Sequence, residues 1–179
     1  PKSEAPIDNF NGYFEFLNND FPAWVHFEDV LYPSVTTAYQ ASRTEDKQIR
    51  QSINEAETYE QLAAIAAKIK NPADWGSRRY KIMESLVRDK FKRNKTIRDK
   101  LVETGTRHLI NKYPKGGDNE TYWGLVNQSG LNNLGKILET VRSEINRGND
   151  TERWLASSFN LERDTRMMPK ILLRVEKDG

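Results

Sequence analysis

Three stretches of the chain carry apolar residues at helical spacing, and each is bounded by residues that begin or end helices. The stripes are Leu62, Ile65, Ala66 and Ile69, then Ile82, Met83, Leu86, Val87 and Phe91, and finally Leu134, Ile137, Leu138, Val141 and Ile145. Asn71 and Pro72 stop the first helix, while Gly148 closes the third. A chain with three such stripes is predicted to bury them against one another in a mainly helical fold.

Shorter signals complete the predicted fold. Alternation over 24–27, a turn at Glu28–Asp29 and a return over 30–32 predict a small hairpin, after which Ser34 caps a helix. Thr96 is expected to cap a further helix that Gly105 ends, and 108–112 to add one helical turn. Residues 113–131 have loop composition, and 171–175 read as a strand. The prediction is a mainly helical α+β single domain over 10–148, with a flexible lead-in at 1–9 and a C-terminal extension at 149–179.

Composition narrows the function classes. Lys and Arg number 28 against 26 Asp and Glu, so the formal charge of +2 gives no bulk case for nucleic-acid binding. There is no cysteine, and His26 and His108 are the two histidines, so no metal site and no cofactor are expected. No apolar run is long enough to span a membrane, and a cytoplasmic location is expected. The basic run at 88–95, interrupted by Asp89, is interpreted as a solvated helix face.

Several polar and aromatic segments recur in the order of a known family. They are Phe16-Leu17-Asn18-Asn19, the stretch 32–43 (YPSVTTAYQASR), Asp74-Trp75, Lys90-Phe91, the stretch 119–124 (NETYWG) and the stretch 130–138 (GLNNLGKIL). Together they resemble the NADAR family, of the YbiA type. The resemblance implies a domain with one polar cleft, into which Asn19, Thr36, Tyr39, Arg43, Trp75, Glu120 and Trp123 converge. It also implies hydrolysis of an N-glycosidic bond, in a riboflavin-pathway riboside or in ADP-ribose attached to guanine, with ADP-ribosylated nucleic acid as a partner.

The positions where the family carries its chemistry are changed. Thr36 stands where the family has Glu, Arg43 where it has Lys, and Glu120 where it has Asp. A carboxylate is needed to stabilise charge at the anomeric carbon, which Thr36 cannot supply. Arg43 cannot form a Schiff base as an amine can, although it can hold a phosphate. Glu120 keeps a carboxylate about one methylene further out, and a ~1 Å misplacement can cost ~100-fold in rate. These three residues are the candidate catalytic set.

The implied binding residues are better preserved. They are Asn19, Tyr39, Gln40, Trp75, Trp123, Gly124 and Asn132. Two hypotheses remain open. In the first, the chain is a diverged N-glycosidase with weakened activity, in which Glu120 or a neighbour such as Asp118 supplies the carboxylate. In the second, it is a catalytically degenerate binding or structural module of phage origin. The extension over 149–179 is expected to pack on the core, on a protein partner or on a second copy of the chain.

Overall fold

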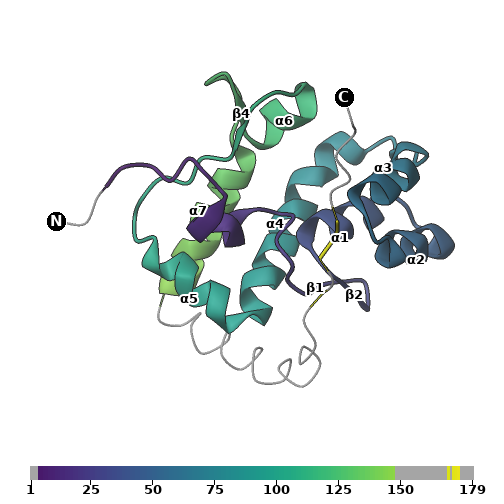
Figure 1. Ribbon diagram of the computed structural model, residues 1–179, viewed down its shortest axis with the longest axis horizontal. Coiled ribbons are helices and arrows are strands. Elements are labelled where there is room, and N and C mark those ends of the chain that lie inside the picture. Colours follow the sequence, from purple (N-terminus) through teal and green to yellow (C-terminus); the bar gives the residue numbers. More distant parts are fainter. Residues whose placement is uncertain (1–3, 148–168, 170, 174–179) are drawn as a thin grey trace. The chain divides into compact units, whose positions relative to one another are not determined.

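The computed structural model describes residues 4–147, 169 and 171–173. The chain divides into two compact units (Figure 1). One contains the described residues 4–19 and 91–147, and the other contains 20–90, 169 and 171–173. The long helix α4 (Trp75–Arg93) begins in the second unit and ends in the first.

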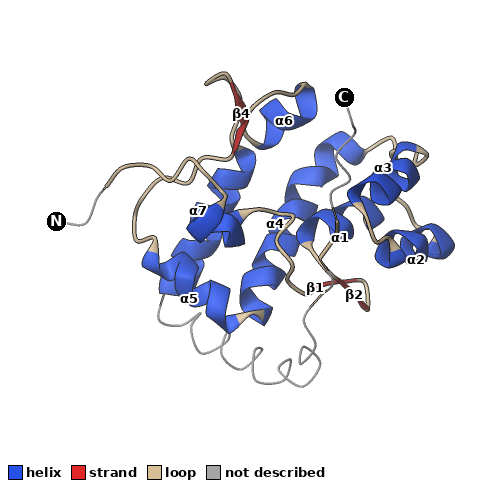
Figure 2. Ribbon diagram, viewed as in Figure 1, coloured by secondary structure: helices blue, strands red, loops and turns tan. Residues whose placement is uncertain are grey.

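Helices dominate both units, and the strands are short (Figure 2). In chain order the elements are η1 (Gly12–Leu17), β1 (Val25–Phe27), β2 (Val30–Tyr32), α1 (Val35–Ala41), α2 (Lys47–Glu55), α3 (Tyr59–Ala67), α4, α5 (Lys95–Glu103), β3 (Lys112–Tyr113), α6 (Asp118–Trp123), β4 (Leu125–Val126) and α7 (Asn133–Asn146). The predicted mainly helical α+β class is confirmed. Helix α2 was not among the predicted elements.

The 20–90 unit begins with the predicted hairpin. Strands β1 and β2 pair antiparallel, with Val25 opposite Tyr32, and the turn residues Glu28 and Asp29 both have positive φ. This left-handed conformation matches the right-handed twist of the flanking strands. The backbone N–H of His26 donates to an Asp89 carboxylate oxygen at 2.7 Å, which ties β1 to α4.

Side-chain caps set the starts of the next three helices. The Ser34 hydroxyl oxygen accepts the Thr37 N–H at 3.0 Å at the start of α1, as predicted. Asp46 accepts the N–H groups of Gln48 and Ile49 at the start of α2, and Thr58 accepts the N–H of Gln61 at the start of α3. These side chains satisfy backbone donors that a helix leaves without an internal partner.

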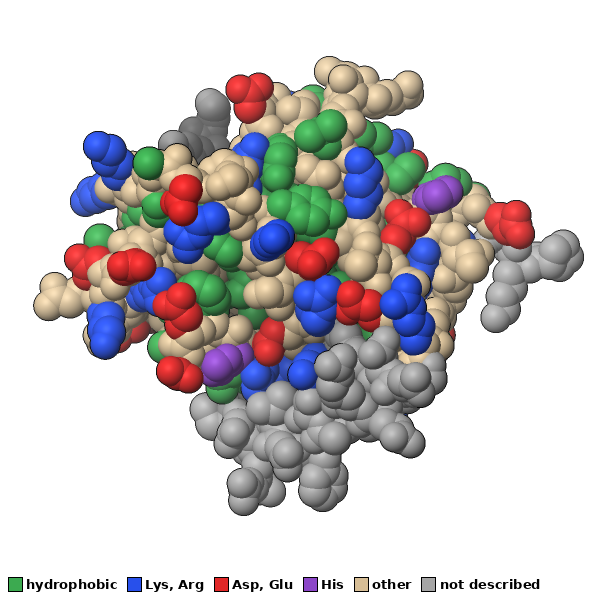
Figure 3. All heavy atoms as spheres, turned by 180° about the vertical axis from the view of Figure 1, so that it is seen from behind, with side chains coloured by type: hydrophobic (Ala, Val, Ile, Leu, Met, Phe, Trp, Pro, Cys, Tyr) green, Lys and Arg blue, Asp and Glu red, His purple; other side chains and the backbone are tan. Residues whose placement is uncertain are grey.

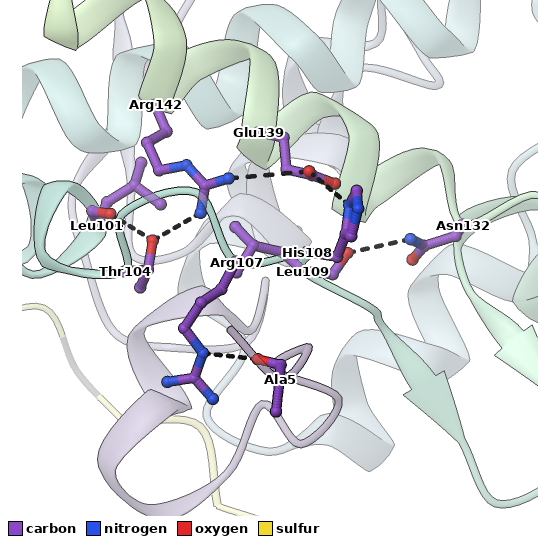
Figure 4. Close-up of polar contacts among 9 residues, drawn as sticks. All are labelled: Ala5, Leu101, Thr104, Arg107, His108, Leu109, Asn132, Glu139 and Arg142. Atoms are coloured by element: carbon purple, nitrogen blue, oxygen red, sulfur yellow. Dashed lines mark hydrogen bonds and ion pairs between the residues drawn. The ribbon is translucent and has the colours of Figure 1, made fainter. Parts of the chain in front are cut away.

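The other unit packs α5 and α7 around a buried arginine (Figure 4). The Arg142 guanidinium donates to the Thr104 hydroxyl oxygen at 2.8 Å, and that hydroxyl donates to the Leu101 carbonyl at the end of α5. Burial lowers the pKa of Arg142, and Glu139 opposes that shift. Glu139 also lies 3.1 Å from Nδ1 of His108, which is exposed as expected. A side chain on α7 therefore binds the Thr104 hydroxyl that caps the C-terminal end of α5.

One expectation for this unit is wrong. Residues 108–112 do not form a helical turn, because Lys112 and Tyr113 pair in parallel with Leu125 and Val126. The same stretch pairs with the expected lead-in, since the Ile7 N–H donates to the His108 carbonyl at 2.8 Å and Ile7 is 2% exposed. Ile7 therefore joins residues 4–10 to the segment around Leu109. Both pairings connect segments that are not neighbours in sequence, so a search for local helical patterns does not predict them.

The stretch expected to be loop over 113–131 needs one correction, and part of the extension is described. Helix α6 lies within the stretch that was expected to be loop. In the extension, Leu173 exchanges backbone hydrogen bonds with Glu57 and Tyr59, and Leu172 is 9% exposed, whereas Ile171 is 70% exposed. The rest of the extension that was expected to pack, including Trp154, Leu155, Phe159 and Val175, lies outside the described residues.

The described surface carries both signs of charge. On the face drawn in Figure 3, Lys and Arg side chains are interspersed with Asp and Glu side chains. Exposed pairs such as Lys95 with Asp99 at 2.7 Å and Arg78 with Asp74 at 3.4 Å lie one helical turn apart. Exposed pairs of this kind stabilise a fold by at most about 1 kcal/mol each. The solvated face expected over 88–95 is wrong at Lys90 and Arg93, which are buried, whereas Lys95 is exposed.

Candidate functional site

Helix α1 and the start of α4 supply an aromatic wall in the 20–90 unit. Tyr39 on α1 and Trp75, the first residue of α4, have ring centroids 5.4 Å apart at an interplanar angle of 49°. Tyr39 is 8% exposed and Trp75 7% exposed, so most of each ring is in contact with protein. Tilted aromatic pairs of this kind are rigid and offer an apolar surface beside polar groups.

Arg43 lies just after α1, and its guanidinium is bound within the protein. Nε donates to the Asn71 side-chain oxygen at 2.6 Å, and one terminal nitrogen donates to the Gln40 side chain at 2.7 Å and to the Ala66 carbonyl at 3.2 Å. The other terminal nitrogen donates to the Ile69 carbonyl at 3.3 Å. Burial lowers the pKa of Arg43. These contacts use four of the five guanidinium N–H groups, and they satisfy carbonyls at the C-terminal end of α3.

Lys90, on α4 in the same unit, is buried at 1% exposure. Burial lowers its pKa to about 7, against an opposing effect of the Asp20 carboxylate. Its Nζ lies 5.7 Å from the centre of the Phe21 ring. Asp20 in turn accepts a hydrogen bond of 2.5 Å from the Thr36 hydroxyl. The unit thus brings together an amine that is half neutral near pH 7, a carboxylate and a hydroxyl.

Neither Lys90 nor Asp20 is among the candidate residues that the sequence suggests. A signal for Lys90 does exist, because it falls three residues after Val87 and four after Leu86, on the apolar stripe of α4. A lysine on a buried stripe must either extend its ammonium to solvent or lose its proton, so this position marks an unusual amine. Asp20 has no comparable signal, since it lies in a loop 16 residues before its partner Thr36.

Asn132, in the other unit, makes hydrogen bonds to two backbone groups through its side-chain amide. Its side-chain oxygen accepts the Asn111 N–H at 2.9 Å. Its side-chain nitrogen donates to the Leu109 carbonyl at 3.0 Å (Figure 4). The residue has φ 52°, the left-handed conformation that Asn tolerates better than most residues. A Cβ at Gly135 would meet the same side chain at 2.4 Å, so Asn132 fits tightly beneath α7.

Glu120, Trp123 and Gly124 belong to α6 and its end. A Glu120 carboxylate oxygen accepts the Gly117 N–H at 3.0 Å and so caps the helix. Trp123 is 3% exposed, and a Cβ at Gly124 would come within 2.0 Å of the Asn111 carbonyl oxygen. The absence of a side chain at Gly124 therefore lets two backbone segments pack in direct contact.

The predicted site residues fall into two groups, one in each unit. Thr36, Tyr39, Gln40, Arg43 and Trp75 lie in the 20–90 unit, while Asn19, Glu120, Trp123, Gly124 and Asn132 lie in the other. Within the first group, Arg43 donates a hydrogen bond to Gln40, and the ring of Tyr39 contacts the ring of Trp75. The convergence of both groups on one cleft stays a prediction.

In residues 4–147, 169 and 171–173, no group of three or more His, Asp or Glu side chains is arranged to hold a metal ion. No helix in that part of the chain combines the length and apolar character needed to cross a membrane.

Comparison with known proteins places these features in a family. A family model described as the NADAR domain matches residues 2–146. An N-glycosidase of Nostoc punctiforme is 33% identical over 135 residues, which cover 72% of this chain and 84% of that protein. The N-glycosidase YbiA of Escherichia coli is 25% identical over 137 residues, which cover 74% of this chain and 82% of YbiA.

Two further matches add to this comparison. A riboflavin biosynthesis protein of Vibrio vulnificus is 29% identical over 133 residues, and the match covers 73% of this chain but 35% of that longer protein. The NMR structure of YbiA from E. coli superposes with a TM-score of 0.69 at 20% identity, covering 81% of this chain and 87% of the other. This similarity establishes a YbiA-like fold.

Proposed function

Because this chain belongs to the NADAR family, we propose that it is an N-glycosidase that hydrolyses an N-riboside and that the Lys90 amine attacks the anomeric carbon. The observation that carries the proposal is the burial of Lys90 at 1% exposure, which lowers the pKa of its amine to about 7. A lysine is a nucleophile only when its amine is neutral, and burial provides that form near neutral pH. The family resemblance implies a lysine at position 43, where this chain has Arg43. We assign the role of that amine to Lys90 instead.

The reaction follows from the chemistry of an amine and a glycosidic carbon. The Lys90 nitrogen forms a bond to the anomeric carbon, and the bond from that carbon to the base nitrogen breaks with its electron pair on the base. The proton that the attacking amine loses ends on the departing base. The sugar ring then opens to an imine, and addition of water releases the free sugar and regenerates the amine. No electron transfer is involved, so no redox partner is required.

Two substrates fit the proposal. Relatives named as N-glycosidases and as a riboflavin biosynthesis protein support a riboside of the riboflavin pathway. ADP-ribose on a guanine base is the second, as the family resemblance implies. In both, the Tyr39–Trp75 pair is proposed to contact the base or sugar, and Arg43 to hold Gln40 and Asn71 in place through its hydrogen bonds.

Trapping the imine tests the proposal. The protein is incubated with ADP-ribosyl-guanosine, and separately with a riboflavin-pathway N-riboside, in the presence of sodium cyanoborohydride. Mass spectrometry should then find the reduced sugar adduct on the peptide that contains Lys90. Lys90→Met should abolish the adduct and the turnover, while the control Lys95→Met, at an exposed site on α5, should leave both unchanged.

The outcomes separate the two classes of function. Turnover without an adduct would show that the chain is an N-glycosidase in which Lys90 is not the nucleophile. Binding of ADP-ribose, measured by calorimetry, without turnover would support the degenerate binding module. The absence of both binding and turnover would contradict the N-glycosidase and the binding module, and would favour a structural module. Turnover of one substrate but not the other would identify the substrate class.

A further inference from the structure

The carboxylate that the family carries at position 36 has a substitute close by. Thr36 is neutral, yet its hydroxyl donates to an Asp20 oxygen at 2.5 Å. The Asp20 carboxylate is therefore hydrogen-bonded to Thr36, which stands at the position where this chain lacks the family's carboxylate. It comes from the loop between η1 and β1 rather than from helix α1.

The surroundings of Asp20 point towards Lys90. Asp20 favours the charged form of the Lys90 amine, and the next residue, Phe21, places its ring 5.7 Å from the same nitrogen. The Thr36 hydroxyl gives its hydrogen to Asp20, so it acts as a donor that fixes one carboxylate oxygen. Position 36 thus orients a carboxylate without bearing one.

We propose that Asp20 is the carboxylate of the reaction and that Thr36 is the residue that positions it. This rests on the proposed function of Lys90 as nucleophile. When the amine nitrogen bonds to the anomeric carbon, Asp20 takes one of its protons. Asp20 then gives that proton to the base nitrogen as the glycosidic bond breaks, and returns to the carboxylate form. General acid–base transfer of this kind contributes about 10²- to 10⁴-fold to rates.

Other carboxylates in the described chain are less suited to this role. Glu28 lies on the surface and pairs with Arg50 at 2.6 Å. Glu120 caps α6 through Gly117, and Asp118 is an exposed residue of the same short helix. Asp89 accepts the His26 N–H and so anchors the hairpin. Among these five groups, Asp20 is the carboxylate whose charge acts on the buried amine.

The first test uses turnover. Asp20→Asn should lower the single-turnover rate by about 100-fold or more, while Glu28→Gln, a matched carboxylate control, should not change it. Thr36→Val should give a smaller loss, which Thr36→Ser should reverse because it keeps the hydroxyl. The double change Asp20→Asn with Thr36→Glu should recover part of the rate by returning a carboxylate to position 36.

The second test does not need a substrate. The pKa of Lys90 can be followed by NMR with ¹³C-labelled lysine. Asp20→Asn should lower that pKa below about 7, since the charge that favours the ammonium is removed. Thr36→Val should shift it in the same direction by less, and Thr36→Ser should restore the wild-type value. A purely structural role for Thr36 would leave the Lys90 pKa unmoved while lowering the melting temperature.

The outcomes distinguish this inference from the proposed function. If Lys90 forms the adduct but Asp20→Asn turns over at the wild-type rate, the assignment of Asp20 is wrong and that of Lys90 stands. If Glu120→Gln abolishes turnover while Asp20→Asn does not, the carboxylate is at position 120. If wild type shows neither turnover nor adduct, both assignments fail as catalysis, and the titration alone decides whether Thr36 positions Asp20 beside Lys90.

Discussion

Lys90 makes the stability of this protein depend on pH in a direction that can be worked out. Its pKa is about 7 in the folded state, against 10.5 for an ordinary lysine. Between these values the unfolded chain holds a proton on Lys90 that the folded chain does not. The free energy of unfolding should therefore rise with pH across this window. The destabilising effect of Lys90 is fully present below pH 7 and disappears above about pH 10.5.

The magnitude follows from the two pKa values. At pH 7 the cost of Lys90 to the folded state is about 4 kcal/mol, and at pH 9 it is about 2 kcal/mol. Lys90→Met removes the titrating group and keeps much of its apolar length. The difference in unfolding free energy between Lys90→Met and wild type should therefore shrink by about 2 kcal/mol from pH 7 to pH 9.

Urea denaturation of both proteins at several pH values measures this difference. Subtracting the two curves cancels the pH dependence of every other group that the mutation does not touch. Lys95→Met, at an exposed site, is the control, and its difference from wild type should stay flat over the same range. Parallel curves for wild type and Lys90→Met would refute the reasoning, because they would show that folding leaves the Lys90 proton in place.

Much of the fold could be predicted because it rests on local patterns. The stripes of α4 and α7, the turn at Glu28 and Asp29, and the Ser34 cap are each encoded within a few residues. The pairing of Ile7 with Leu109 joins segments about 100 residues apart, and nothing local indicates it. Helix α6 was missed for a related reason. It is six residues long, and its packing depends on the contact of Gly124 with a distant carbonyl.

The candidate site was predicted less well, because motif positions do not reveal what a side chain contacts. Arg43 and Asn132 stand at positions that the family pattern marks as functional, yet the structure shows both bonded to the protein's own backbone and side-chain amides. The role of Lys90 was not predicted, because a lysine in a basic run suggests a solvated helix face. The role of Asp20 was not predicted either, because the helix pattern around Thr36 does not indicate which loop residue contacts it, and Asp20 lies 16 residues earlier.

Three further predictions concern stability and can be read from melting temperature and urea denaturation. Arg43→Lys should destabilise the protein by about 1–3 kcal/mol, because an ammonium cannot replace the contacts of a planar guanidinium. A loss no larger than that of Arg78→Lys, at an exposed site, would contradict a stabilising role for the hydrogen bonds of Arg43. Gly124→Ala should cost about 1–3 kcal/mol or more, since the new Cβ would lie 2.0 Å from a carbonyl oxygen, and a wild-type melting temperature would contradict that close packing. The last concerns the extension, where the Leu173 carbonyl accepts the Tyr59 N–H, a donor of the first turn of α3 that has no partner within its own helix. Leu172 is 9% exposed beside this pairing, so Leu172→Asp should lower stability by about 2–5 kcal/mol through lost burial and an unpaired carboxylate. Ile171→Asp, at 70% exposure one residue earlier, should change it by about 0.5 kcal/mol or less. Equal effects of the two substitutions would mean that the extension does not dock through Leu172, because only docking makes these neighbours differ.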